Sequence, residues 1–188
     1  ARQGVAVGLW SLVLTTDDGG QTWREQTLDA PPGYGRADLN LMGLFADAKG
    51  GLYATAERGQ LLHSVDYGQS WRYLDTGYEG TLWSGAALAD GSLLVGGQRG
   101  TLLHGSADGR NWRHVPLQSK SSVTSIVAAR RQVLIAGLDG LLVRSRDGGR
   151  SFQRQDAEDG VSLTAALLAD GDSPVLFSRR GVIAAQGE

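Results

Sequence analysis

The sequence contains no cysteine, and only four of its 188 residues are proline. Without cysteine the chain has no disulfide framework and no thiol chemistry. It also has no apolar run near the roughly 18 to 20 residues that a membrane-spanning helix needs. The formal net charge is only −2, whereas a general nucleic-acid binder carries a marked basic excess. We therefore expect no nucleic acid as a partner and no direct insertion into a membrane.

Helical periodicity is missing as well, because no helix-start signal is followed by a ten-residue amphipathic run. Glycine, in contrast, occurs 28 times, as a fold with many tight turns requires. Apolar residues make up 41% of the chain, which is sufficient for a core. The length fits one domain of roughly 100 to 200 residues.

A short motif recurs four times along the chain. It is most regular at Ser64–Trp71, which reads Ser-x-Asp-x-Gly-x-Ser-Trp. Thr16–Trp23 has Thr for each Ser, Ser145–Phe152 has Phe for Trp, and Ser106–Trp112 is one residue shorter. The closing aromatic residues are 48, 41 and 40 positions apart. A repeat near this period is typical of solenoids and propellers.

The residue types of the motif suit a turn between two strands. The Ser or Thr hydroxyl and the Asp carboxylate accept backbone N–H bonds, and the Gly takes a backbone angle that a Cβ would resist. The aromatic residue then returns the chain to the core. Turn formation explains these Asp residues better than catalysis or metal binding. The residues concerned are Thr16, Asp18, Gly20, Trp23, Ser64, Asp66, Gly68, Trp71, Ser106, Asp108, Gly109, Trp112, Ser145, Asp147, Gly149 and Phe152.

This motif resembles the Asp-box, or BNR repeat, of sialidases, sortilin-type receptors, some xyloglucan hydrolases and the photosystem II assembly (stability) factor family. The segment Gly91–His104, with its Gly-x-x-Gly turn before a Leu-rich strand and the box, is most similar to the assembly factors. The resemblance covers nearly the whole chain. It implies a seven-bladed ring and an Arg-rich surface that binds protein.

Short strands fill the spaces between the motifs, four in each period of about 40 residues, which is the β-propeller pattern. We predict an all-β propeller of four-stranded antiparallel blades within one domain or propeller fragment, 1–188. The predicted blades are 39–76, 81–117 and 123–156, with partial blades at 1–28 and 163–186. These form an arc of about five blades, three complete and two partial, from a larger ring. Additional blades from a longer parent chain would complete it. The strand Leu39–Ala46 is apolar at nearly every position, so we expect it to be buried on both faces.

Arginine recurs before Gly in the turn between the second and third strands of a blade. Arg58, Arg99 and Arg180 hold this place, and Arg36 lies in a Pro-rich loop. Because loops on a rigid scaffold often carry function, we predict that these residues bind a partner. The alternative is that Arg merely solvates a tight turn.

Trp83 stands near the start of an innermost strand, where it is either an aromatic platform at the channel mouth or a core residue. His63 and His104 occupy equivalent strand positions without a third ligand, so we expect no metal and no cofactor.

Enzyme activity has little support in the sequence. A sialidase needs an Arg triad, a Tyr nucleophile and paired acids, and the Arg-Ile-Pro segment of that family is missing. Asp47, Asp90 and Asp170 each precede a turn, which local turn chemistry explains. We predict a non-enzymatic bacterial propeller that binds protein and serves the assembly or stability of a membrane complex. The alternative is a carbohydrate-active or carbohydrate-binding module related to sialidase and glycoside hydrolase propellers. The chain begins Ala1-Arg2 without Met, so we expect a processed, cut or trimmed product. We expect the protein in the periplasm or otherwise outside the cytoplasm.

Overall fold

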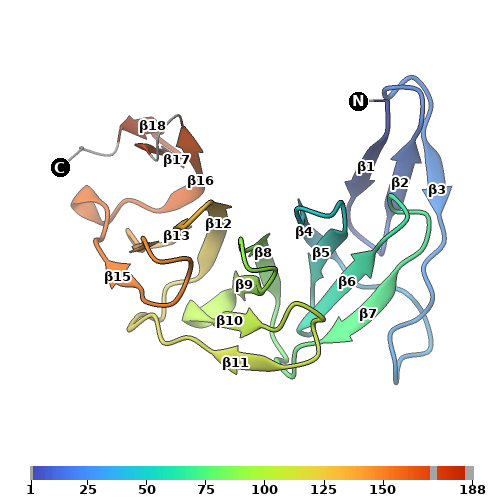
Figure 1. Ribbon diagram of the computed structural model, residues 1–188, viewed down its shortest axis with the longest axis horizontal. Helices are drawn as coiled ribbons and strands as arrows, with labels where there is room; N and C mark the ends of the chain where they lie inside the picture. Colours follow the sequence, from blue (N-terminus) through green and yellow to red (C-terminus); the bar gives the residue numbers. More distant parts are fainter. Residues whose placement is uncertain (1, 170–172, 185–188) are drawn as a thin grey trace. The chain divides into compact units, whose positions relative to one another are not determined.

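A computed structural model describes residues 2–169 and 173–184. Within these ranges the chain forms antiparallel strands in five sheets, and its only helical pieces are two single 3₁₀ turns (Figure 1). Every sheet keeps its strands in chain order, so within a sheet each strand pairs with the next one along the sequence. The all-β prediction is confirmed. Asp170 and residues 185–186 of the last predicted blade lie outside the described residues.

The five sheets are numbered in chain order. Sheet 1 has three strands, β1 (Gly4–Val7), β2 (Val13–Thr16) and β3 (Arg24–Gln26). Sheets 2, 3 and 4 have four strands each: β4 (Leu41–Ala46), β5 (Leu52–Ala56), β6 (Gln60–Ser64) and β7 (Arg72–Asp75) in sheet 2; β8 (Leu82–Ala87), β9 (Leu93–Gly97), β10 (Leu102–Gly105) and β11 (Trp112–His114) in sheet 3; β12 (Val123–Ala129), β13 (Gln132–Gly137), β14 (Leu142–Ser145) and β15 (Gln153–Arg154) in sheet 4. Sheet 5 has three described strands, β16 (Leu163–Ala169), β17 (Ser173–Ser178) and β18 (Gly181–Ala184).

The chain divides into two compact units, one ending at Leu82 and one beginning at Trp83. In the first unit, sheets 1 and 2 pack face to face around a buried cluster. Its buried members are Val13, Leu39, Leu41, Ala54, Ala56 and Leu62, with Val5, Val7, Leu28, Trp71 and Tyr73 packed against them. Side chains alternate between the faces of a strand, so each sheet contributes every second residue to this cluster.

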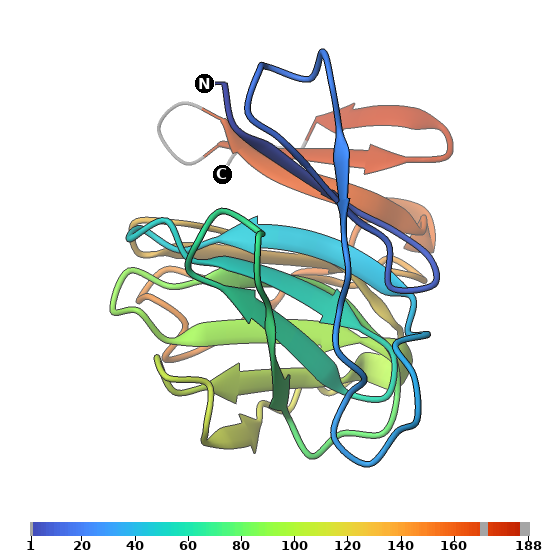
Figure 2. The same ribbon diagram turned by 90° about the vertical axis from the view of Figure 1, so that its right-hand side faces the viewer.

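The second unit contains sheets 3, 4 and 5, and sheet 4 has an apolar cluster on each of its faces. Ile135 and Val143 belong to the cluster shared with sheet 3. Leu134 and Leu142 belong to the cluster shared with sheet 5. Figure 2 shows sheet 5 in orange to red as a twisted antiparallel sheet. The middle sheet of this unit is therefore buried on both faces by its neighbours.

The prediction that Leu39–Ala46 is buried on both faces is wrong. In β4 burial alternates, with Leu41 buried and Met42 and Leu44 exposed. Side chains alternate between the two faces of a strand, and the face with Leu41 packs in the cluster between sheets 1 and 2, whereas Met42 and Leu44 lie on the other face. Nearly continuous burial belongs instead to the second strand of each four-stranded sheet: every residue of β9 (Leu93–Gly97) is buried, and all but the first residue of β5 and of β13.

The closing aromatic residues of the motif are less buried than expected. Trp71 and Phe152 pack against apolar clusters but remain partly exposed. The indole N–H of Trp71 donates to the Gly68 carbonyl at 3.0 Å, and that of Trp112 donates to the Gly109 carbonyl at 2.9 Å. This bond holds the ring beside its own turn, so one edge stays in contact with solvent. Trp23, the first of the series, is largely exposed.

Candidate functional site

The four Ser/Thr-x-Asp turns use the carboxylate as a fixed acceptor. In the second turn, Ser64 Oγ donates to Asp66 Oδ1 at 2.8 Å and accepts from the Gly68 N–H at 2.9 Å. The N–H and hydroxyl of Ser70 both donate to Asp66, at 2.9 and 2.5 Å. Asp18 and Asp147 make the same set of bonds. The motif residues therefore close their own turns.

These bonds keep the carboxylates ionised. The hydroxyl and N–H of Ser70, with smaller help from Ser64, lower the pKa of Asp66 to about 2. The pKa values of Asp18 and Asp147 lie well below the usual range, chiefly through Thr22 and Ser151. A general acid must hold a proton near neutral pH, which these carboxylates do not. Their chemistry is structural.

Two histidines on third strands each accept a hydrogen bond from an arginine. The Arg72 guanidinium lies 3.0 Å from His63 Nδ1, and Arg113 lies 2.8 Å from His104 Nδ1. Arg is only a donor, so each Nδ1 is an acceptor and each ring is neutral. Burial first, and then the neighbouring arginine, lower the pKa of both histidines. Among the described residues, no group of three or more His, Cys, Asp or Glu side chains could hold a metal ion.

We predict that the free energy of unfolding falls as pH drops through about 6.5, the ordinary His pKa. Both histidines have a lower pKa in the folded chain, so the unfolded chain takes up protons first and is favoured by acid. Urea unfolding midpoints at pH 7.5 and 5.5 measure this effect. The variant His63→Gln/His104→Gln keeps an acceptor for each arginine and should show a smaller difference between the two pH values. An equal pH difference in both proteins would contradict the prediction.

At the end of the sheets opposite the Ser/Thr-x-Asp turns, the hairpins close with two-residue turns. Both central residues of these turns have positive φ, as in type I′ turns. Arg58-Gly59, Arg99-Gly100 and Asp139-Gly140 have this geometry. Sheet 1 has it at Trp10-Ser11, with φ of 57° and 58°. The sequence pattern missed this turn because Ser stands where the other turns have Gly. A positive φ is unusual for a bulky residue such as Trp, and Trp10 is 73% exposed.

Asn40 joins the turns of sheets 1 and 2. Its side-chain carbonyl accepts from the Trp10 N–H at 3.1 Å, and its side-chain amide donates to Glu57 at 3.1 Å. The backbone N–H of Asn40 donates to the same Glu57 carboxylate, and the backbone carbonyl of Asn40 accepts from the Glu57 N–H. The Ser11 N–H is bound by the Leu39 carbonyl at 2.7 Å. Both turns are thus held by the same segment of chain, and Trp10 is presented on a fixed backbone.

Two arginines and a tyrosine lie beside these turns. The Arg58 guanidinium carbon is 4.6 Å from the centre of the Tyr34 ring, a cation–π arrangement. Arg58 and Arg36 both reach Asp38, at 3.7 and 3.0 Å. The two guanidinium groups share the Asp38 carboxylate, while the nearby Glu57 carboxylate is bound by Asn40. We call Leu9, Trp10, Tyr34, Arg36 and Arg58 the turn patch; each of its members is exposed.

The other candidates lie in the second unit. Arg99 is exposed, and its N–H donates to Ser122 Oγ at 3.2 Å. Arg180 is exposed in the β17–β18 turn, where its N–H donates to Ser178 Oγ at 3.0 Å. Trp83 is partly buried at the start of β8. Their assignment to a partner surface stays a prediction, and so does a surface shared with Arg58 of the first unit.

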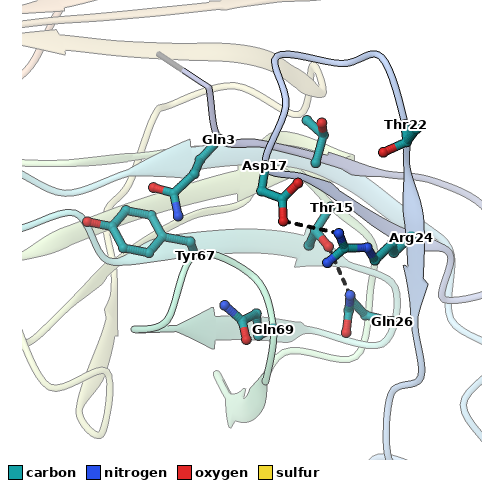
Figure 3. A pocket seen from close by; sticks show the side chains of 9 residues that line it. Gln3, Thr15, Asp17, Thr22, Arg24, Gln26, Tyr67 and Gln69 are labelled. Atoms are coloured by element: carbon teal, nitrogen blue, oxygen red, sulfur yellow. Dashed lines mark hydrogen bonds and ion pairs between the residues drawn. The ribbon is translucent and has the colours of Figure 1, made fainter.

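A polar hollow of about 140 Å³ lies beside the Ser64–Trp71 turn (Figure 3). Tyr67 and Gln69 line it from that turn, and Asp17 and Arg24 line it from the first turn and β3. Asp17 pairs with Arg24 at 3.1 Å, and Gln26 donates to Thr15 at 2.8 Å. Asp17 is the only carboxylate among the residues that line the hollow. The hollow offers hydrogen bonds, but it lacks the paired carboxylates of a glycosidase.

Repeated antiparallel sheets that pack face to face within each unit define the class as a β-propeller. No protein-family model and no curated protein matches the sequence. Among solved structures, YCF48 bound to D1 peptide matches with a TM-score of 0.73 at 18% identity, over 96% of this chain and 59% of that one. YCF48 from Cyanidioschyzon merolae matches with a TM-score of 0.72 at 16% identity, over 97% and 65% of the two chains. Virginiamycin B lyase from Staphylococcus aureus matches with a TM-score of 0.67 at 12% identity, over 98% and 70%.

These likenesses show the fold, a β-propeller like those of YCF48 and virginiamycin B lyase. The chain spans less than two thirds of the two YCF48 chains. In the ranges that the structure describes, no helix is long and apolar enough to cross a membrane.

Proposed function

We propose that this protein is a non-enzymatic β-propeller that binds another protein and serves the assembly or stability of a membrane complex. The turn patch is the observation that carries the proposal. Trp, Tyr and Arg are the side chains that most often dominate the binding energy of protein interfaces. Here Trp10 and Arg58 lie on turns that Asn40 joins, and Tyr34 stacks on Arg58. The backbone of both turns is already fixed, so their ordering on binding would cost little entropy.

The structural neighbours support the same proposal. A YCF48 structure of similar fold is described as bound to D1 peptide, so this fold can hold a segment of another protein. The Ser/Thr-x-Asp turns have the residues and hydrogen bonds that we expect of Asp-boxes, and we propose that they are. The carbohydrate alternative is not favoured by these neighbours. We further propose, from the family resemblance alone, that the protein acts outside the cytoplasm, which fractionation of the source cell would test.

The two guanidinium groups of the turn patch should govern association with an acidic partner. The double variant Arg36→Glu/Arg58→Glu replaces both guanidinium groups with carboxylates and should capture at least about tenfold less of the partner, because rim charges act through steering and salt dependence. The assay is capture from detergent-solubilised membranes of the source cell with the whole chain as bait, followed by quantitative mass spectrometry at two salt concentrations. Arg24→Glu is the control, because Arg24 is an exposed arginine beside the Ser/Thr-x-Asp turn.

Equal capture of a membrane-complex subunit by the wild type and the double variant would reject the turn patch. Each surface change should leave stability within about 0.5 kcal/mol, so chemical denaturation separates lost binding from lost folding. If the wild type captures no such subunit, the proposed function itself fails.

Trp10→Ala should weaken binding of the captured subunit roughly 30-fold, since loss of an aromatic hot spot costs about 2 kcal/mol or more. The measurement is titration of the purified subunit onto the immobilised propeller. Val65→Ala is the matched control, because Val65 is also highly exposed but lies in the Ser64–Trp71 turn. Equal affinities of the two variants would contradict the role given to Trp10.

A further inference from the structure

The hollow beside the Ser64–Trp71 turn lies between the two sheets of the first unit. Its walls come from β2, β3 and the residues around them in sheet 1, and from the turn of sheet 2 (Figure 3). A Cβ at Gly68 of that turn would meet Val5 and Thr15, at 2.8 and 3.4 Å. The turn therefore packs directly on this face of sheet 1, and the hollow belongs to the packed interface between the two sheets.

Small side chains at two positions of sheet 1 make room for the hollow. Strand pairing places Val5 opposite Thr15, and it places Tyr53 opposite His63 at the corresponding positions of sheet 2. The Tyr53 and His63 rings stack with their centres 4.4 Å apart. Sheet 3 also has a histidine, His104, at the position of Thr15. Sheet 1 thus lacks the two large side chains that sheet 2 has at this place.

The arginine of the outer strand therefore has a different partner in sheet 1. Arg24 lies opposite Thr15 in the strand register, as Arg72 lies opposite His63. Arg72 donates to His63 Nδ1, whereas Arg24 reaches Asp17 at 3.1 Å. The side chains of Arg24 and Asp17 are 70% and 59% exposed, and exposed ion pairs contribute little to stability. A ligand that carries both charges can replace this pair at small cost.

Tyr67 is the third departure from the repeat at this hollow. Its φ is 60°, and the corresponding residues of the Thr16–Trp23 and Ser145–Phe152 turns are Gly19 and Gly148, with φ of 82° and 78°. A bulky residue is unusual at positive φ, and strained residues of this kind gather at ligand-binding sites. Tyr67 lines the hollow and is 55% exposed. All three departures from the repeat thus meet at one place.

The lining of the hollow selects a small ligand with two opposite charges. The volume of about 140 Å³ is well below the roughly 300 Å³ at which sites for drug-sized ligands begin. An anion bound to Arg24 would lie beside the Asp17 carboxylate, and a cation bound to Asp17 would lie beside the Arg24 guanidinium. Like charges placed side by side are unfavourable. A zwitterion satisfies both groups at once.

We propose that this hollow binds a free α-amino acid, with its carboxylate on Arg24 and its ammonium group on Asp17. A guanidinium group binds a carboxylate through two parallel N–H bonds, and an ammonium group donates to a carboxylate. The lining also includes the side-chain amides of Gln3, Gln26 and Gln69, which both donate and accept hydrogen bonds. The ligand is therefore an amino acid with a polar, uncharged side chain. The proposal does not rest on the function proposed above.

Titration of the isotope-labelled whole chain with free serine, threonine, asparagine and glutamine, followed by nuclear magnetic resonance, tests the proposal. At least one of the four should bind with a millimolar or lower Kd. Its N-acetyl and methyl-ester forms each lack one of the two charges, so each should bind at least about tenfold more weakly. Glucose, a neutral polar molecule, should not bind. No binding of any of the four amino acids, or equally tight binding of a blocked form or of glucose, would overturn the proposal.

Thr15→His is the most direct variant, because it gives sheet 1 the side chain that sheets 2 and 3 have at this position. The imidazole fills the hollow and offers Arg24 the acceptor that Arg72 has in sheet 2. Amino-acid binding should therefore be lost, while the midpoint of urea unfolding does not fall. Val65→Ala is the control and should bind normally, since Val65 lies on the same turn but does not line the hollow. A folded Thr15→His variant that binds as the wild type does would disprove the site.

Tyr67→Gly separates binding from folding. Glycine takes a positive φ without strain, so the urea midpoint should not fall, whereas loss of the ring from the wall of the hollow should raise the Kd of the amino acid several-fold. A Tyr67 that served only the turn would leave that Kd unchanged. This last result would count against the proposal as well.

Discussion

Gly59→Ala should destabilise the protein by at least about 3 kcal/mol, the range reached only by a clash or strain that the fold cannot relieve. Gly59 has a φ of +65°, and a Cβ built there would lie 1.6 Å from the Tyr78 carbonyl oxygen. That oxygen belongs to the backbone, so no side-chain rotation relieves the clash. The N–H of Gly59 also donates to Gly80 at 2.7 Å, and its carbonyl accepts from the Thr76 hydroxyl at 2.7 Å. The turn is therefore fixed from both sides.

Gly33→Ala is the matched control for this prediction. Gly33 has a φ of +84° but no neighbouring atom within 4 Å of a built Cβ, so only the backbone cost of about 1 kcal/mol applies. Urea unfolding of the two variants measures the difference. A second pair lies in the other unit, where a Cβ at Gly100 would lie 2.0 Å from the Ser119 carbonyl oxygen, while Gly148 has open space. Equal losses within either pair would show that the close approach is not present in solution.

Trp71→Ala should cost about 3 kcal/mol, at the low end for a large aromatic residue in a core, because the ring is only partly buried. The indole packs with the cluster between sheets 1 and 2 and donates to the Gly68 carbonyl. Its removal takes away both the apolar contact between the sheets and the bond that fixes the ring. Chemical denaturation followed by far-ultraviolet circular dichroism gives the loss.

Trp71→Phe separates the two contributions. Phe keeps most of the apolar contact but loses the indole N–H, so we expect a loss of about 1 kcal/mol, the net worth of one hydrogen bond. If the Phe variant were as unstable as the Ala variant, the hydrogen bond would be the main contribution. If both variants stayed within about 0.5 kcal/mol of the wild type, Trp71 would not join the two sheets.

The fold could be predicted well from the sequence, because its signals are local. The Ser/Thr-x-Asp turns bind their own backbone within a few residues, as Asp66 does with Ser70. The four short strands of each period follow from alternating apolar residues and Gly turns. The extent of burial could not be predicted, since an apolar run such as Leu39–Ala46 does not say which of its faces a neighbouring sheet covers.

The candidate site was predicted in part. Arg36 and Arg58 were expected to belong together, and the structure joins them through Asp38. Trp10 was missed, because its turn has Ser at the position that is Gly in the equivalent turns. Tyr34 was missed because it lies 24 residues before Arg58 in an irregular loop, and no local pattern connects them.

By itself the sequence determined the repeat, the order of the strands and the chemistry of the turns, all of which depend on residues close together in the chain. The tertiary structure alone decided which equivalent residues are covered and which are exposed. Phe152 and Trp23 hold the same place in the motif, but Phe152 packs against the apolar cluster between sheets 3 and 4, whereas Trp23 is largely exposed. The tertiary structure also decided that Asn40 holds Trp10, 30 residues away, next to Glu57. Both outcomes depend on contacts between distant segments, whose energies a local pattern does not contain.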